Sequence, residues 1–420
     1  MVNKGYKQTE IGVIPDEWKL KHLNDFGDVI SGGTPSTSVK EYWDGTVAWC
    51  TPSDITSTKG KYIFKTDRYI TNQGLRNSTA TVLPKNSILL CTRATIGELK
   101  LSGVPMATNQ GFKNLCSNDS GNVDYLYYLL QTKRKDMLEL AIGSTFLEIS
   151  KKALCSIALQ TPSLPEQQRI AEALSDVDNM IISLEKLIAK KKAIKQGAMQ
   201  ELLTGKKRLS GFSGKWQECT LDDLCDLITK QTGFDYTNEI KPSLVEINSN
   251  RTLPFIQNKD FEGKKVNIKT DYYIPYDVAF KYPRILLDET CLLVSLSGRI
   301  GNIGLYEKSN GLAFIGGAVG ICRFKCEQKA EWCMLYLQSS AGQKQIFECQ
   351  KSGAQHNLTV EDVRKLVIKL PATIEEQTAI ASILSDMDNE IEALEDKLNK
   401  TRQIKQGMMQ ELLTGRIRLV

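Results

Sequence analysis

Apolar side chains recur with alternating spacings of four and three residues in two long stretches of the chain. They fall at Ile170, Leu174, Val177, Ile181, Leu184 and Ile188 in the first stretch, and at Ile380, Leu384, Met387, Ile391, Leu394 and Leu398 in the second. This spacing is typical of a coiled-coil seam, along which two helices bury one apolar stripe against each other. The pattern therefore predicts two long helices that pair with each other.

The two stretches are copies of one another. Residues 166–209 and 376–419 align without a gap, and about 26 of the 44 positions are identical. A helix of about 38 residues, at ~1.5 Å per residue, is about 57 Å long. Pro165 stands where a helix can start, and Gly205 and Gly415 stand where the two helices can end. Each helix could instead pack only on its own neighbouring domain, but two matching seams in one chain favour an antiparallel coiled coil.

The blocks that precede the two helices are also related, although more weakly. SILLCTRATIG in the first block aligns with CLLVSLSGRIG in the second, and NQGFKNL aligns with GGAVGICRF. Short apolar runs at residues 45–50, 87–91 and 291–296 predict strands, and residues 123–141 and 328–350 predict helices. Long polar loops, such as residues 31–45, are typical of segments that carry function.

The predicted fold class is therefore α+β, with two mixed α/β domains joined by two long antiparallel coiled-coil helices in a pseudo-two-fold repeat. The predicted boundaries are residues 1–163 and 210–373 for the domains, and residues 164–209 and 374–420 for the central and C-terminal helices.

Composition and charge narrow the class of protein only slightly. The 420-residue chain is 41% hydrophobic and 25% charged, which is ordinary for a folded soluble protein. No apolar run approaches the ~18 residues that a membrane helix needs, and the polar start lacks the apolar core of a signal peptide. We therefore expect a cytoplasmic protein. The net charge of +5 is compatible with binding to nucleic acid without requiring it.

The sequence lacks the motifs of the common enzyme classes. No GxxxxGK[ST] loop is present, and GRIGNIG does not have the spacing of a dinucleotide-binding fingerprint. Only two histidines occur, which disfavours a histidine-activated nucleophile. Among the eleven cysteines, the cluster of Cys322, Cys326 and Cys333 does not have zinc-site spacing. We expect reduced thiols, no metal site and no catalytic residue.

Several motifs together carry a resemblance to a known family. They are IPDEWKLKHLNDFGDVISGGTPST, TPSDI, the junction PSLPEQQRIAEALSDVD, and KQGxMQELLTG at the end of both helices. Over its full length the chain resembles the specificity subunits of type I restriction–modification enzymes.

The resemblance implies a non-catalytic subunit with two target recognition domains. Each domain would recognise one half of a bipartite, asymmetric site in double-stranded DNA. Two methyltransferase subunits would dock on the helices, and restriction subunits with ATP-driven translocase activity would complete the complex. No cofactor is expected on this chain, since S-adenosylmethionine, ATP and Mg would be bound by the partner subunits.

Base readout and phosphate contacts require Arg, Lys, Asn, Gln and small hydroxyl side chains, and such residues in the polar loops are our candidates. In the first domain the DNA-binding candidates are Ser31, Gly33, Thr34, Ser36, Lys40, Trp43, Ser53, Arg93, Asn109, Gln110, Lys113 and Ser144. In the second domain they are Gln231, Arg251, Lys259, Arg284, Arg299, Lys325, Gln355, His356 and Asn357. For Trp43, stacking on DNA and a place in the core remain equally open.

Residues that are identical in both helices are the candidates for binding two identical partners. They are Asp176, Asp178, Asn179, Gln196, Gly197, Gln200, Asp386, Asp388, Asn389, Gln406, Gly407 and Gln410. The alternative is that these residues only cap or hinge the coil. A glycine inside a helix costs ~1 kcal/mol relative to alanine, so Gly197 and Gly407 indicate either a close helix crossing or a partner contact.

Two other functions remain open from the sequence. The chain could be a standalone DNA-binding module or a nuclease with an unrecognised site, and activity of the isolated chain on DNA would favour this. It could also be a coiled-coil scaffold without a role on nucleic acid. Absent or salt-insensitive DNA binding would favour the scaffold, because phosphate contacts make DNA binding fall steeply with salt.

Overall fold

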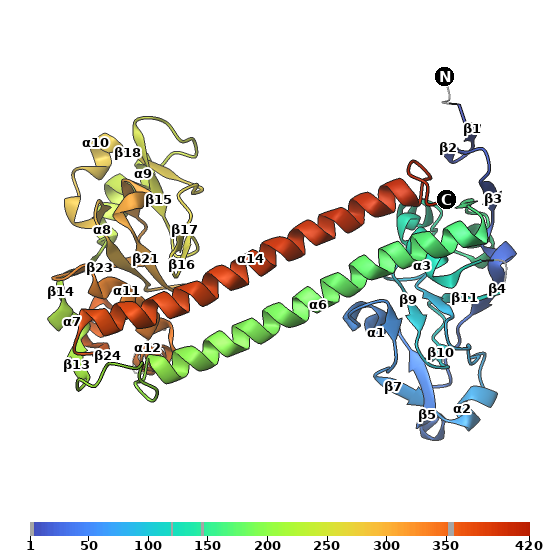
Figure 1. Cartoon of the computed structure of the whole chain (residues 1–420), viewed down its shortest axis with the longest axis horizontal. Helices are drawn as coiled ribbons and strands as arrows, with labels where there is room; N and C mark the ends of the chain where they lie inside the picture. Colours follow the sequence, from blue (N-terminus) through green and yellow to red (C-terminus); the bar gives the residue numbers. More distant parts are fainter. Residues whose placement is uncertain (1–3, 119–120, 144–146, 352–356) are drawn as a thin grey trace. The chain divides into compact units, whose positions relative to one another are not determined.

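The computed structural model describes residues 4–118, 121–143, 147–351 and 357–420, which form two compact units (Figure 1). Unit 1 comprises Met1–Leu187 and Leu394–Val420, and unit 2 comprises Ile188–Ala393. Both contain helices and mixed sheets, so the predicted fold class is confirmed. Each of the two long helices, α6 (Leu164–Leu202) and α14 (Ile374–Leu412), contributes one part to each unit.

Unit 1 is built on a five-stranded sheet and a three-stranded sheet. The first has the order β4 (Gly27–Ser31), β11 (Lys113–Ser117), β8 (Ile88–Leu90), β9 (Leu99–Ser102) and β6 (Tyr62–Ile63), and the second has the order β10 (Ala107–Thr108), β5 (Trp43–Cys50) and β7 (Arg68–Ile70). Two further pairs are β1 (Tyr6–Thr9) with β2 (Gly12–Pro15), and β3 (Lys19–Lys21) with β12 (Leu159–Thr161). The short helices are η1 (Leu23–Phe26), η2 (Lys40–Tyr42), α1 (Pro52–Ser57), α2 (Asn72–Arg76), α3 (Val123–Thr132), α4 (Arg134–Glu139) and α5 (Lys151–Cys155).

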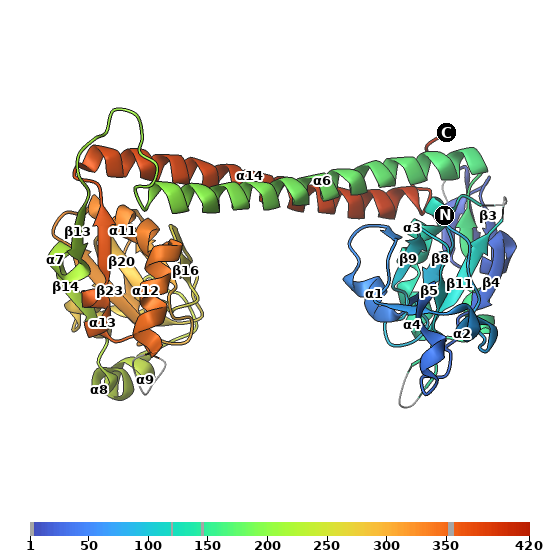
Figure 2. The ribbon, with the colours of Figure 1, turned by 90° about the horizontal axis from the view of Figure 1, so that it is seen from below.

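Unit 2 is built on two four-stranded sheets. They have the orders β14 (Cys225–Lys230), β23 (Val319–Phe324), β20 (Cys291–Ser295), β21 (Ile303–Tyr306), and β18 (Tyr273–Pro275), β15 (Thr252–Ile256), β22 (Ala313–Ile315), β19 (Leu286–Leu287). Two further pairs are β13 (Gln217–Thr220) with β24 (Val367–Leu370), and β16 (Phe261–Glu262) with β17 (Lys265–Val266). The short helices are α7 (Leu221–Leu224), α8 (Gly233–Asp235), η3 (Tyr236–Ile240), α9 (Lys241–Ser243), α10 (Tyr276–Ala279), η4 (Pro283–Ile285), η5 (Lys308–Asn310), α11 (Lys329–Gln338), α12 (Ser340–Lys351) and α13 (Val360–Lys365). Figure 2 shows α11 and α12 beside the first of these sheets.

Strand register reveals the repeat within the two units. The antiparallel pair β4–β11 corresponds to β14–β23, because Ser31 pairs with Lys113 as Lys230 pairs with Gly320. The parallel pair β5–β10 likewise corresponds to β15–β22. The internal repeat expected from the sequence is therefore present in the fold as well as in the helices.

Two predicted helices are interrupted. Residues 123–141 form α3 and α4, which meet at Lys133, where φ is −91° and ψ is 9°. Residues 328–350 divide at Ser339, whose backbone is extended and whose Oγ accepts a hydrogen bond from the Gly342 amide at 3.3 Å. The apolar periodicity did not reveal these breaks, because both parts of each segment bury apolar residues.

The long helices pair in antiparallel fashion within each unit. In unit 1, Lys405 binds Asp178 at 2.7 Å and Arg402 binds Glu185 at 2.6 Å. In unit 2, Lys191 binds Glu390 at 2.6 Å. Residue numbers on one helix fall as those on the other rise, so the predicted antiparallel pairing is confirmed. No helix in the described ranges is long and apolar enough to cross a membrane.

The start of each seam packs on a domain rather than on the other long helix. Ile170 and Leu174 of α6 lie in the core of unit 1 with Trp18 and the apolar face of α3. Ile380 and Leu384 of α14 lie in the equivalent core of unit 2. Both arrangements considered from the sequence therefore occur, at different points along each helix.

In each unit, an ion pair to a buried glutamate connects the start of one long helix to the segment that follows the other. In unit 1, Arg418 Nε lies 2.6 Å from Glu166 Oε1, and the indole Nε1 of Trp18 donates to Glu166 Oε2 at 3.2 Å. In unit 2, Arg208 Nε lies 2.6 Å from Glu376 Oε1. The hydrogen bonds that Arg418 donates to Glu166 raise the pKa of its guanidinium above the usual value.

Candidate nucleic-acid interface

Four loops of unit 1 meet at one end of its sheets. They follow β4, β5, β8 and β10, and main-chain hydrogen bonds join them. Gly33 donates to the Thr108 carbonyl at 2.9 Å, Asn109 donates to the Cys50 carbonyl at 3.0 Å, and Thr92 donates to the Gly111 carbonyl at 2.8 Å. The loops that follow β4 and β10 lie so close together that a Cβ on Gly32 would be only 1.8 Å from the Asn109 carbonyl oxygen.

This loop cluster gathers most of the predicted residues of the first domain. The residues brought together are Ser31, Gly33, Thr34, Ser53, Arg93, Asn109, Gln110 and Lys113. The Thr34 hydroxyl donates to the Gln110 side-chain carbonyl, while Arg93 Nε and Lys113 Nζ lie 3.0 Å and 3.7 Å from the Glu148 carboxylate. Two cations share one anion, so the cluster keeps a positive charge that suits a phosphate backbone.

Three predicted residues of this domain lie outside the cluster, and a fourth cannot be placed. Ser36 and Lys40 are exposed farther along the loop that follows β4. Trp43 is 9% exposed, donates from Nε1 to the Ser36 carbonyl at 3.0 Å, and packs edge-on against Trp49. The structure therefore assigns Trp43 to the core, one of the two roles left open by the sequence. Ser144 lies outside the described residues.

Unit 2 has a loop cluster at the equivalent place. Gly316 donates to the Ile256 carbonyl at 2.7 Å, as Asn109 does to Cys50 in unit 1. Asn258 Nδ2 donates to the Ser297 carbonyl at 2.7 Å, and Leu358 donates to the Leu296 carbonyl at 2.9 Å. These bonds bring loops bearing four predicted residues together. The four are Gln231, Lys259, Arg299 and Asn357.

The remaining predicted residues of the second domain have other surroundings. Lys325 lies at the opposite end of the β14–β23 pair, where its Nζ donates to the Asp223 carbonyl at 2.9 Å. Arg251 precedes β15, whereas the cluster follows it. Strand direction therefore places both residues away from the loop cluster. Arg284 is exposed on η4, and Gln355 and His356 lie outside the described residues.

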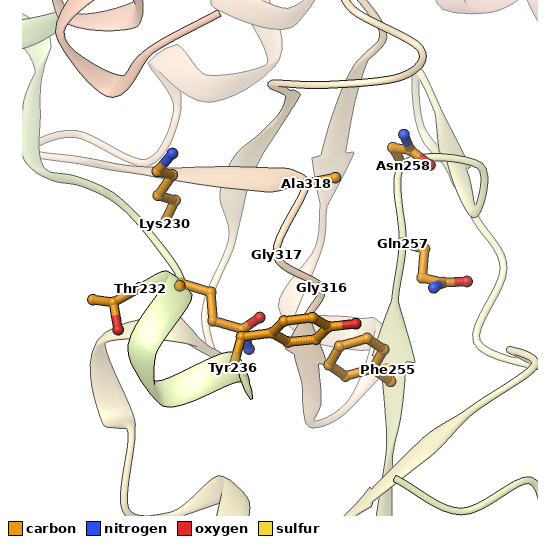
Figure 3. Close-up of a pocket in the computed structure, with 11 residues that line it drawn as sticks. Lys230, Thr232, Tyr236, Phe255, Gln257, Asn258, Gly316, Gly317 and Ala318 are labelled. Atoms are coloured by element: carbon orange, nitrogen blue, oxygen red, sulfur yellow. The ribbon is translucent and has the colours of Figure 1, made fainter. Parts of the chain in front are cut away.

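A hollow of about 360 Å³ lies in the loop cluster of unit 2 (Figure 3). Gln231 lines it and is 3% exposed; its Oε1 has no hydrogen-bond partner. Lys230, Gln257 and Asn258 also line the hollow, and the sequence analysis missed all three. Lys230 ends β14 and Gln257 and Asn258 follow β15, and alignment of these strand ends with the first domain could have found them.

A buried cysteine, Cys91, lies beside the loop cluster of unit 1. Burial raises the pKa of the Cys91 thiol, beside the cluster of unit 1, to about 12, so the thiol is protonated at neutral pH. In the part of the chain that the structure describes, no group of three or more His, Cys, Asp or Glu side chains could hold a metal ion.

Comparison with known proteins identifies the repeated unit. The family described as the type I restriction modification DNA specificity domain matches residues 15–196 and again residues 213–403. The chain belongs to this family. The two matches together include both loop clusters and most of both long helices.

Relatives and solved structures of this specificity family agree with that assignment. The MjaVIII specificity subunit of Methanocaldococcus jannaschii is 26% identical over 97% of this chain and 94% of its own length. The MjaIX subunit of the same organism is 39% identical over 43% of this chain, a match that spans 42% of that relative. A crystal structure of the type I restriction–modification S subunit from M. genitalium has the same fold, with a TM-score of 0.59, 16% identity, and coverage of 98% of this chain and 97% of that one.

Most of the helix residues that we predicted to bind partners are exposed. The exposed residues are Asp176, Asn179, Gln196, Gly197, Gln200, Asp386, Asn389, Gln406, Gly407 and Gln410, together with Asp388. Asp388 nevertheless pairs with Lys195 across the coil. Asp178 is half-buried and accepts a hydrogen bond from the Tyr128 hydroxyl at 2.7 Å, in addition to its ion pair with Lys405. For these two aspartates the contacts favour the alternative role of holding the coil together.

Gly197 and Gly407 have open surroundings. A Cβ placed on either glycine would meet no atom within 4 Å other than the backbone of the neighbouring turns of its own helix. A close helix crossing among the described residues therefore does not explain them, and the partner contact remains the prediction. Ile194 and Ile404, three residues earlier, are 47% and 50% exposed, so each helix presents the same apolar strip.

Proposed function

We propose that the chain is the DNA-recognition subunit of a type I restriction–modification complex, in which each unit recognises one half of a bipartite, asymmetric site. One observation carries this proposal: equivalent loop clusters in the two units hold different side chains. Asn109 and Gln110 in unit 1 correspond to Gly316 and Gly317 in unit 2. A repeated frame with different loops suits two different DNA sequences.

The length of the helices suits a divided site. Half-sites on one face of B-DNA have centres about one turn, ~34–36 Å, apart. A helix of 39 residues at ~1.5 Å per residue is about 58 Å long, which exceeds that distance. We propose two specific segments separated by a nonspecific gap of about half a turn.

The partners follow from the helices. We propose that two methyltransferase subunits bind the identical outward faces around Gly197 and Gly407, and that restriction subunits join through them. S-adenosylmethionine, ATP and Mg would be bound by those subunits, and this chain would contribute recognition rather than catalysis. A solved structure similar to this chain, with a TM-score of 0.61 and 16% identity, comes from work on complex assembly of a type I system.

Co-expression with its methyltransferase subunit, followed by genome-wide mapping of methylated adenines, tests the function. We expect a bipartite motif that depends on this chain. Exchanging residues 1–163 for the corresponding domain of a relative should change one half of the motif and leave the other unchanged. An uninterrupted motif, or DNA cleavage by the isolated chain, would contradict the proposal.

A second prediction concerns the docking face. Replacing Gly197 and Gly407 together with tryptophan should weaken methyltransferase binding at least tenfold, because the bulky side chain would occupy the contact. The matched control is the double alanine variant, which should bind normally and gain up to ~1 kcal/mol of helix stability per site. Binding is measured by calorimetry and stability by thermal melting. Unchanged affinity of the tryptophan variant would exclude these glycines from the interface.

A further inference from the structure

The hollow in unit 2 lies where glycines replace two residues of unit 1 that have side chains. Gly316 and Gly317 replace Asn109 and Gln110, and Phe255 replaces Trp49, whose Nε1 donates to the Gly33 carbonyl at 2.9 Å. A Cβ on Gly316 would lie 3.2 Å from the Phe255 ring, and one on Gly317 would lie 3.3 Å from Gln231 Oε1. Any side chain at these two positions would therefore enter the space.

The floor of the hollow is aromatic and its mouth is exposed. Phe255 is buried, and Tyr236 packs on the same apolar cluster; Figure 3 shows the two rings below the Gly316–Ala318 segment. Lys230 and Gly317 are exposed at the mouth. Aromatic side chains provide a sequence-tolerant surface on which a single base can stack. A lysine at the mouth suits the phosphate attached to such a base.

The walls carry amide groups that are free to recognise a base edge. The side-chain amide of Gln257 has no hydrogen-bond partner among the described residues, and Gln231 Oε1 is also unpartnered. A glutamine amide matches the N6 donor and N7 acceptor of adenine. The Asn258 amide is held in place by its bond to the Ser297 carbonyl. This match to the amino group and N7 is the reason for choosing adenine as the proposed base.

One exposed apolar side chain stands near the mouth. Phe234 is 78% exposed on α8, two residues before Tyr236. Apolar side chains that enter a base stack separate neighbouring bases and help a base to leave the duplex. Phe234 could fill the gap that a displaced base leaves behind.

We infer that this hollow receives one unstacked adenine of the bound DNA. The inference rests on the proposed recognition of DNA by unit 2, and it assigns to that unit a way of reading sequence that unit 1 lacks. A base held in the hollow would stack on Tyr236 and Phe255, place its amino edge at Gln257, and leave its phosphate near Lys230. Unit 1, where Asn109 and Gln110 stand in place of Gly316 and Gly317, would recognise its half-site through the exposed edges of paired bases.

Fluorescence of 8-vinyladenine tests the inference, because this analogue keeps the 6-amino group and N7 of adenine and brightens when it leaves the base stack. In the complex with methyltransferase subunits, each adenine of the half-site recognised by unit 2 is replaced in turn. We expect a several-fold rise at one adenine other than the methylated one, since methyltransferases themselves extrude the base they modify. Gly317→Leu should abolish the rise, while Glu327→Ala, an exposed change beyond the opposite end of β23, should retain it.

Other outcomes of this experiment distinguish failure of the inference from failure of the proposed function. Tight, salt-dependent binding with no bright position would overturn the inference and leave the proposed function intact. Failure of every duplex to bind would overturn both. Gly317-dependent binding of the free 8-vinyladenine nucleotide, with no bright position in DNA, would indicate a nucleotide site and overturn the inference. Should Gly317→Leu fail to fold, Gln257→Leu at a half-buried position provides the same test, with at least a threefold smaller rise expected.

Discussion

Replacing Arg418 with methionine is expected to lower the free energy of unfolding of unit 1 by about 3–5 kcal/mol, the usual cost of removing one partner of a buried ion pair. The Glu166 side chain is 2% exposed. Its carboxylate accepts from Arg418 Nε at 2.6 Å, from Arg418 Nη2 at 2.9 Å and from Trp18 Nε1 at 3.2 Å. Methionine would leave this charge buried with only the indole as a donor.

Urea denaturation of the full chain measures the effect, with one transition expected to shift. The matched control is Arg402→Met, because Arg402 pairs with Glu185 on the helix surface with 52% of its side chain exposed. Surface pairs contribute about 0–1 kcal/mol. Equal losses in the two variants would show that Glu166 relaxes to solvent. Arg208→Met should reproduce the Arg418 result in unit 2, since Glu376 is also 2% exposed.

Replacing Gly32 with alanine is expected to remove recognition by unit 1 while unit 2 keeps its own. The added Cβ would lie 1.8 Å from the Asn109 carbonyl oxygen and 2.4 Å from Thr108 Oγ1. Because the Asn109 amide is bonded to Cys50, the loop that follows β10 cannot yield without disturbing the β5–β10 pair. Strain of ~1–3 kcal/mol would weaken DNA binding by about 5–150-fold.

Methylation mapping and binding to duplexes with one altered half-site distinguish the two units. The half of the motif assigned to unit 1 by domain exchange should become degenerate, and the other half should stay intact. Gly233→Ala, in the equivalent loop of unit 2, is the control, because its Cβ would lie in open space. Full methylation by the Gly32 variant would contradict the role of the loop cluster.

The helices show what sequence can supply. Leu184, Ile188, Ile391 and Leu398 are buried, as the seam predicted, because an apolar stripe is stabilised when it leaves water. The near-identity of the two copies also determined the repeat, the antiparallel pairing and the family. These features follow from the spacing and repetition of residues, which can be read from the sequence without a structure.

Only the tertiary structure decided which loop residues lie together. Lys325 and Lys230 both sit on paired strands of one sheet, yet strand direction places them at opposite ends. Trp43 and Gln231 were both candidates for contacting DNA, but Trp43 is packed against Trp49 and Gln231 lines a hollow. Loop side chains are positioned by contacts between segments distant in sequence, such as Asn109 with Cys50 and Gly316 with Ile256. No local period records those contacts, so the sequence determined the helical frame, and only folding decided which side chains meet in the loop clusters.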